Sequence, residues 1–259
     1  MIISDRHRFA FVHIPKCAGT SVRKALRPID AKDSIFDGMG THPHMGMVNY
    51  AHFTLDDLSC HFPDQYRKVA EYRSVAIVRD PVDRFFSAIF QRLREFKGYE
   101  QSRITAKVIA GEVDAVIDTL GATTGRLILE YVHFNRQSDY VFHNGQRIVT
   151  EVFALDRLAD AATYIENCTG VRLDETAPEN RTVALRAGVL APVMQKLRKP
   201  YAAIVPLGTR DRVRSRLTKF GLYGSVEKRQ FLKPGSRAER FLGEHYATDF
   251  ELYASASRR

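Results

Sequence analysis

The feature that most constrains the fold of this chain is an apolar run that stops abruptly at a turn of small residues. Phe9–Ile14 predicts a strand. Pro15, Lys16 and the letters CAGTS then separate it from a helix predicted near Thr20–Leu26. A continuous apolar run without alternation is typical of a strand buried on both faces, as in a parallel sheet covered by helices. The N-terminal segment therefore favours an α/β fold.

A second unit of the same kind follows further along the chain. Ser74–Val78, SVAIV, is again a continuous apolar run that fits a buried parallel strand. Asp80 can cap the helix that follows, and Pro81 occupies its first position. The apolar residues after Pro81 recur at helical spacing. We expect a strand, a short turn and a long helix.

The rest of the chain repeats this alternation. A strand over Glu151–Asp156 precedes a helix that ends at Gly170, and Ala238–Ala254 reads as one final amphipathic helix. Residues 98–136 read as helical, and residues 28–50 as an irregular loop rich in Gly, Pro, His and Met. The alternation predicts one domain over residues 1–259, with a P-loop-type parallel sheet flanked by helices.

Composition limits the partners and the compartment. The 259 residues carry a net charge of +9, which favours an anionic ligand. The basic stretch Met194–Phe220 is interpreted as a lining for an acidic glycan, a contact with an anionic membrane surface, or a solvated face. The three cysteines include no CxxC pair, and no signal peptide or membrane span is predicted, so we expect a cytoplasmic protein.

The turn after the first strand has the properties of an anion-binding loop. Backbone N–H groups at a helix start have no partner within the helix, and the helix dipole favours negative charge there. Ala18 and Gly19 allow close backbone approach, Thr20 and Ser21 add hydroxyl donors, and Lys16 adds a positive charge. The loop is therefore predicted to bind a phosphate or sulfate group.

The order of residues differs from that of a nucleotide triphosphatase. A Walker A loop places lysine after glycine and directly before Ser or Thr, whereas Lys16 precedes Gly19 here. A nucleotide triphosphatase also uses a Walker-B Asp after a strand to hold Mg²⁺, whereas Arg79 follows the second strand here. We therefore expect anion binding that requires no metal.

Two motifs resemble those of the PAPS-dependent sulfotransferase superfamily, where PAPS is 3′-phosphoadenosine 5′-phosphosulfate. HIPKCAGTSV, residues 13–22, is similar to the loop for the 5′-phosphosulfate, and VRDPVDRFFSAIF, residues 78–90, to the site for the 3′-phosphate. FLGEHYATDFELY, residues 241–253, is a looser match to a final helix. The resemblance is closest to the heparan-sulfate 2-O-sulfotransferase branch and its bacterial relatives.

The resemblance implies a role for each matching residue. Lys16 would stabilise the charge on the leaving phosphate, and Thr20 and Ser21 would hold the 5′-phosphate with the backbone of Cys17 to Ser21. The resemblance also makes Cys17 a small residue tolerated in the loop, and not a nucleophile. Arg79 and Ser87 would bind the 3′-phosphate and so exclude ATP. The product nucleotide would be PAP, adenosine 3′,5′-bisphosphate.

The resemblance also implies a base between the two motifs, a histidine or a carboxylate, that activates the acceptor hydroxyl. His52 is the first candidate, His42 and His44 are rivals, and Asp56 and Asp57 are weaker ones. His52 as a structural histidine is one alternative. A metal held by His42, His44 and His52 is a less favoured one, because no carboxylate or Cys lies at the usual spacing.

The expected function is sulfuryl transfer from PAPS to a hydroxyl of a carbohydrate or glycan. Residues 7–97 and 139–170 would bind PAPS. Residues 28–60, 98–136 and 180–235, with Asn180 and Arg181 as candidates, would build the acceptor site. One rival is a P-loop kinase of a small molecule that requires ATP and Mg²⁺. The other is a basic polyanion-binding protein. A nucleic-acid partner is not expected, because the basic stretch lacks interleaved aromatic residues.

Overall fold

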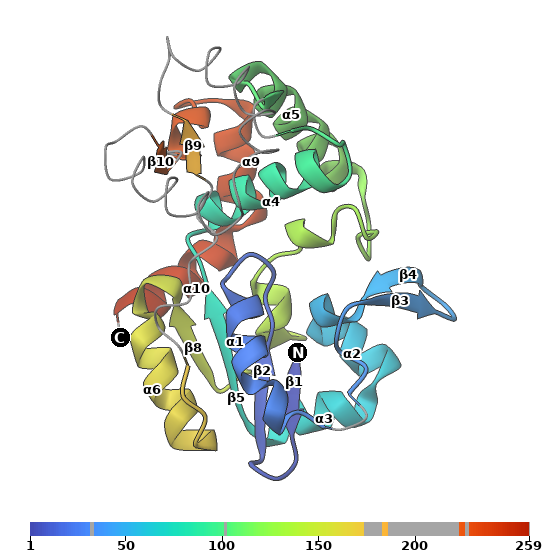
Figure 1. Cartoon of the computed structure of the whole chain (residues 1–259). Coiled ribbons are helices and arrows are strands. Elements are labelled where there is room, and N and C mark those ends of the chain that lie inside the picture. The colour runs from blue at the N-terminus through green and yellow to red at the C-terminus, as the bar shows by residue number, and fades with distance from the viewer. Residues whose placement is uncertain (32–33, 101–102, 174–182, 186–222, 226–227, 259) are drawn as a thin grey trace, which may run out of the picture.

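A four-stranded sheet forms the centre of the protein (Figure 1). The computed structural model describes residues 1–31, 34–100, 103–173, 183–185, 223–225 and 228–258. Across the sheet the strands run in the order β1 (Ile2–Ser4), β2 (Phe9–Val12), β5 (Arg73–Val78) and β8 (Glu151–Ala154). β2, β5 and β8 are parallel, and β1 pairs with β2 in the antiparallel direction. The predicted P-loop-type α/β fold is confirmed, and β1 is a short strand that the sequence did not indicate.

Helices flank this sheet (Figure 1). They are α1 (Gly19–Leu26), α3 (Pro63–Glu71), α6 (Leu158–Thr169) and α10 (Ala247–Arg258). β5 is buried from Ser74 to Val78 without alternation, because both of its faces are covered. Gly170 ends α6 in the left-handed conformation with φ 72°, as the sequence predicts.

A second apolar core lies among helices beyond the carboxyl ends of the parallel strands (Figure 1). It packs α4 (Pro81–Glu95), α5 (Ala106–Ala122) and α9 (Arg237–His245) together. The predicted start of α4 is confirmed, because the Asp80 side chain accepts a hydrogen bond from the Asp83 backbone N–H at 3.0 Å. The turn between β5 and α4 is therefore held by both cores.

Three regions differ from the sequence-based expectation. Residues 28–50 are not wholly irregular, because β3 (Met39–His42) and β4 (Gly46–Asn49) form a hairpin. The final helix is two helices, since the chain departs from helical geometry at Tyr246, which has φ −108° and ψ 22°. Within residues 98–136, α5 is the long helix, and most of the other described residues are irregular, apart from a short turn and a 3₁₀ segment at Val132–Phe134.

Short elements complete the described chain. The remaining α-helix is α2 (Leu55–His61), and the remaining strands are β6 (Phe142–His143), β7 (Gln146–Arg147), β9 (Val183–Leu185) and β10 (Tyr223–Ser225). The 3₁₀ segments are η1 (Arg27–Ile29), η2 (Tyr50–His52), η4 (Val132–Phe134), η5 (Ser138–Tyr140), η6 (Leu155–Arg157) and η7 (Lys228–Phe231). No helix in the described part of the chain is long and apolar enough to cross a bilayer.

Candidate functional site

The loop between β2 and α1 has the backbone of an anion-binding turn. Lys16 and Ala18 are both left-handed, with φ 69° and φ 59°, although neither is glycine. Left-handed residues within a tight turn are a feature of backbone concavities that bind anions through successive N–H groups. Thr20 and Ser21 lie exposed in the first turn of α1, as expected for hydroxyl donors that meet a ligand.

Glycine at position 19 is explained by close packing against His13, and not by a left-handed backbone. Its φ is not left-handed, and a β-carbon at this position would lie 1.9 Å from Cδ2 of His13. The imidazole of His13 therefore occupies the space that a side chain would need. Gly19 brings the start of α1 against a buried histidine.

The two predicted loops meet at the carboxyl ends of β2 and β5. A guanidinium nitrogen of Arg79, Nη1, donates to the backbone oxygen of Lys16 at 3.5 Å. Burial, together with the positive charges of Arg94 and Arg79, lowers the pKa of the Lys16 amine to about 8. Ser87 lies buried on α4, in the helix that Arg79 precedes. The structure thus brings Lys16 and Arg79 together, and their unfavourable interaction with each other favours a bound anion.

Lys228 is a third cation at this place, and the sequence analysis missed it. It is buried at the start of η7, and its amine donates to the backbone oxygen of Asp83 at 3.2 Å. Burial, followed by the charge of Arg79, lowers the pKa of Lys228 to about 8. Its neighbour Arg229 pairs with Asp80 at 2.6 Å and so fixes η7 against the start of α4. The sequence analysis placed this residue only within the segment 180–235, which was expected to build the acceptor site.

Three buried histidines lie beside the first loop. The ring of His52 is 5.1 Å from that of His13 and 4.9 Å from that of His133, measured between centroids. Burial lowers the pKa of His13 and His52 well below the usual value, and lowers the pKa of His133 to about 3. The positive charge of Lys16 contributes to the low pKa of both His52 and His133. All three imidazoles are therefore neutral at physiological pH.

His52 is also oriented through its backbone. The hydroxyl of buried Tyr140 donates to the His52 carbonyl at 3.0 Å, and Asn49 caps the short turn that carries the histidine. Within the described residues the Nδ1 atom of His52 has no hydrogen-bond partner, so this nitrogen is not committed to a structural contact. His133 was not singled out in the sequence, because nothing in residues 98–136 indicated contact with His52.

The rival bases lie elsewhere. The ring of His42 packs against those of His61 at 4.9 Å and His44 at 5.9 Å, away from the cluster that contains His52. The carboxylate of Asp57 is occupied by the cap of Thr54 and by Arg126 at 2.8 Å, and Asp56 is exposed. The three histidines of the metal alternative do not form a group, and the described residues contain no cluster of His, Cys, Asp and Glu that could hold a metal ion.

A polar cavity of about 340 Å³ lies at the start of α2, and His52 is not among the residues that line it. Thr54 and Asp57, at the start of α2, form one part of its wall, and Arg126 and Asp139 form another. The remaining lining residues are Asp56, Gly125, Asn135, Arg136, Phe142, His143 and Asn144. Such a lining offers many donors and acceptors within a space large enough for a small ligand.

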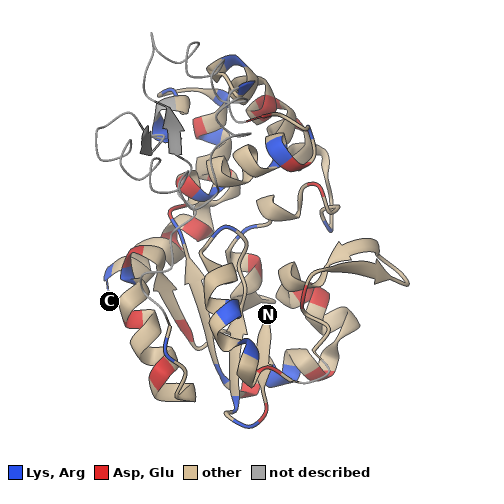
Figure 2. Cartoon of the chain, viewed as in Figure 1, with Lys and Arg blue, Asp and Glu red and all other residues tan. Residues whose placement is uncertain are grey.

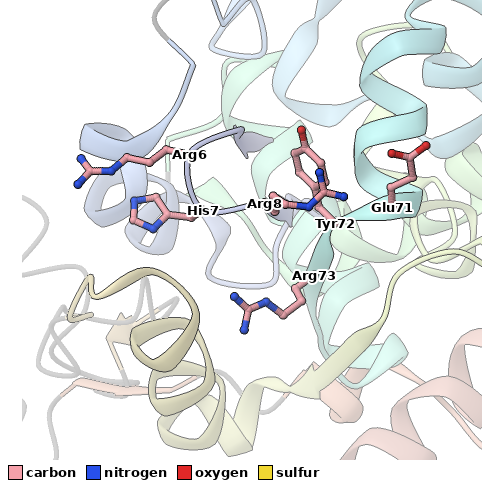
Figure 3. Close-up of a pocket in the computed structure, with 6 residues that line it drawn as sticks. All are labelled: Arg6, His7, Arg8, Glu71, Tyr72 and Arg73. Atoms are coloured by element: carbon pink, nitrogen blue, oxygen red, sulfur yellow. The ribbon is translucent and has the colours of Figure 1, made fainter.

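A second hollow, of about 300 Å³, lies at the opposite edge of the sheet, where β5 begins with Arg73 (Figure 3). Its basic side chains point in different directions, and the guanidinium of Arg8 is stacked over Tyr72 at 4.7 Å from the ring centroid.

Figure 2 shows Lys and Arg interspersed with Asp and Glu over the described helices. Asn180, Arg181 and the basic stretch 194–220 lie outside the described residues.

The protein has a P-loop-type α/β fold, in which cationic side chains gather at the carboxyl ends of the parallel strands β2 and β5. The sequence matches the sulfotransferase family over residues 1–254, and the chain belongs to this family. Family membership makes the protein a transferase that moves a sulfuryl group. No curated protein and no solved structure matches the chain. The resemblance to the heparan-sulfate 2-O branch stays a prediction.

Proposed function

We propose that the protein transfers a sulfuryl group from PAPS to a hydroxyl of a carbohydrate. The observation that carries this proposal is the gathering of Lys16, Arg79 and Lys228 at the carboxyl ends of two parallel strands, with neutral His52 near Lys16. The three cations suit a ligand that bears several anionic groups, and the neutral imidazole suits proton abstraction.

The residues present fit PAPS in both of its anionic parts. The left-handed turn, the backbone of Cys17 to Ser21 and the Thr20 and Ser21 hydroxyls would hold the 5′-phosphosulfate. Arg79 and Ser87 would hold the 3′-phosphate. Lys228 adds a charge close to Arg79 that distinguishes a bisphosphate from a nucleotide with one phosphorylated position. These contacts require no metal.

The reaction is a displacement at sulfur. The acceptor oxygen forms a bond to sulfur while the bond between sulfur and the bridging phosphate oxygen breaks, and PAP leaves with the electron pair. His52 accepts the hydroxyl proton, which a neutral imidazole can do without first losing a proton. Lys16 stabilises the negative charge that develops on the departing phosphate.

The polar cavity at the start of α2, whose lining begins at Thr54, two residues after His52 in the chain, supports a carbohydrate as the acceptor. Hydroxyl groups of a sugar need paired donors and acceptors, and the cavity contains amide, carboxylate and guanidinium groups. Residues 54–57 and 125–139 supply most of its lining. They fall largely within two of the segments predicted for acceptor binding, 28–60 and 98–136.

Calorimetric titration of the metal-free protein with PAP, ATP and AMP tests the proposed donor. We expect PAP to bind at least tenfold more tightly than AMP, because only PAP presents a 3′-phosphate to Arg79 and Lys228. Arg79→Ala should weaken PAP binding and leave AMP binding little changed. Preference for ATP with Mg²⁺ would support the kinase alternative. Salt-sensitive binding of polyanions without any nucleotide effect would support the polyanion-binding alternative.

Substitution of the two neighbouring histidines tests the base. We expect His52→Gln to lower kcat by about 10²-fold or more while the Kd for PAP stays within a factor of about three. His133→Gln is the matched control, because it alters a ring that packs directly against His52 in the same cluster. If His133→Gln abolishes turnover and His52→Gln does not, the base is His133.

A further inference from the structure

The side chain of Gln137 connects the two loops of the candidate site. It is completely buried. Its amide nitrogen, Nε2, donates to the backbone oxygen of Arg79 at 2.9 Å, and its amide oxygen, Oε1, accepts from the backbone N–H of Arg79 at 2.8 Å. The same oxygen accepts from the Cys17 thiol at 3.3 Å. One amide group therefore contacts the residue after Val78, where β5 ends, and the residue after Lys16.

Asp249 fixes Gln137 from the far end of the chain. This buried carboxylate on α10 accepts from the backbone N–H of Gln137 at 2.7 Å and from that of Ser138 at 2.8 Å. A buried carboxylate costs free energy unless it is hydrogen-bonded, and here each of its two oxygens accepts one bond. The carboxylate sets the position of the backbone from which the Gln137 side chain reaches both loops.

We infer that Gln137 and Asp249 are positioning residues that hold the Lys16 loop and the Arg79 loop in one fixed relation. The inference rests on the proposed function, in which these loops bind the two anionic ends of one nucleotide. A ligand that spans two sites is bound tightly only when the spacing of the sites is set before binding. Neither residue touches the ligand in this account.

The chain offers a control with matching contacts at the other end of β5. There the Thr150 hydroxyl accepts from the backbone N–H of Ser74 at 2.8 Å and donates to the Ser74 backbone oxygen at 2.6 Å. As with Gln137 and Arg79, one side chain pairs with both backbone groups of a single residue. Thr150→Val removes these bonds at the edge of the sheet away from the anion site.

The experiment compares Gln137→Met, Asp249→Asn and Thr150→Val with the unaltered protein below the melting temperature of each. We expect Gln137→Met to raise the Kd for PAP about tenfold, because the loss of two or more buried hydrogen bonds releases both loops. Asp249→Asn should give a smaller increase in the same direction. Thr150→Val should lower the melting temperature and leave the Kd unchanged. An unchanged Kd in Gln137→Met, or an equal increase in Thr150→Val, would overturn the inference.

Hydrogen exchange of the ligand-free protein gives a readout that is independent of the donor. We expect Gln137→Met to accelerate amide exchange in residues 16–21 and 79–83 together, whereas Thr150→Val leaves both segments as they were. If the unaltered protein does not bind PAP, the proposed donor is wrong, and exchange alone decides whether Gln137 couples the loops. Unaltered exchange at both loops in Gln137→Met would refute the coupling whatever the ligand is.

Discussion

At the scale of single residues, the absence of a side chain at Gly19 has the largest effect on the site. It allows the buried ring of His13 to lie against the start of α1, and the ring of His13 in turn contacts that of His52. The loop, the helix start and the predicted base are therefore linked through one packed histidine. A substitution at Gly19 is therefore expected to affect His52 through His13, without direct contact with His52.

Gly19→Ala is expected to disrupt this packing. The new β-carbon would collide with the His13 ring, so we expect the free energy of unfolding to fall by about 2 kcal/mol and PAPS-dependent turnover to fall further than stability explains. Denaturant unfolding and turnover assays measure the two effects. Gly111→Ala, in the middle of α5 with open space around it, is the control and should gain up to about 1 kcal/mol. Similar stability of the two variants would contradict the packing argument.

The sequence predicts some of these residues and not others for a physical reason. The structure brings Lys16 and Arg79 together, as the two motifs indicated, because each lies in the turn after a strand and parallel strands place their carboxyl ends at one edge of the sheet. Gln137, His133 and Lys228 reach the site from other segments. Their positions depend on packing between elements, which local periodicity does not contain.

At the scale of elements, the long buried segments were predictable and the short or exposed ones were not. β2, β5, α4 and α6 carry continuous apolar runs or clear caps. The hairpin of β3 and β4 exposes Met39 and Met47, so it lacks the alternation of a half-buried strand.

The division of the final helix into α9 and α10 had no signal in the sequence. No Pro or Gly marks the break at Tyr246. The buried Tyr246 hydroxyl instead donates to the backbone oxygen of Phe134 at 2.7 Å, which anchors the chain at this point. The break allows α10 to approach the sheet and to place Asp249 beneath Gln137.

At the scale of the whole molecule, three segments distant in sequence bring together His13, His52 and His133 as buried neutral rings. If one of these rings were protonated in the folded protein, a charged imidazole would be buried away from water, which costs free energy. The unfolded chain can protonate these histidines near pH 6.5, whereas the folded protein resists protonation. Stability is therefore expected to fall as the pH falls below about 6.5.

The His133→Gln variant measures how much of this loss of stability at low pH comes from the His133 ring. The pKa of His133 is about 3 in the folded protein, so the residue costs stability progressively from about pH 6.5 down to pH 3. Between pH 6.5 and 5.5 we expect the unaltered protein to lose about 1 kcal/mol more of its unfolding free energy than His133→Gln loses. Urea unfolding at both values of pH measures this difference. An equal loss in the two proteins would show that His133 is protonated in the folded state.

The way Gln137 holds Arg79 has a consequence for altering the choice of donor. Gln137 pairs with the backbone of Arg79 and makes no hydrogen bond to its guanidinium, whose contacts with Lys16 at 3.5 Å and Asp83 at 3.8 Å are long. The backbone of Arg79 therefore holds the loop in position, whereas its guanidinium is the group that would recognise the ligand. We expect that an engineer could exchange the side chain at position 79, to accept a nucleotide with a different ribose substituent, while the architecture of both loops is retained.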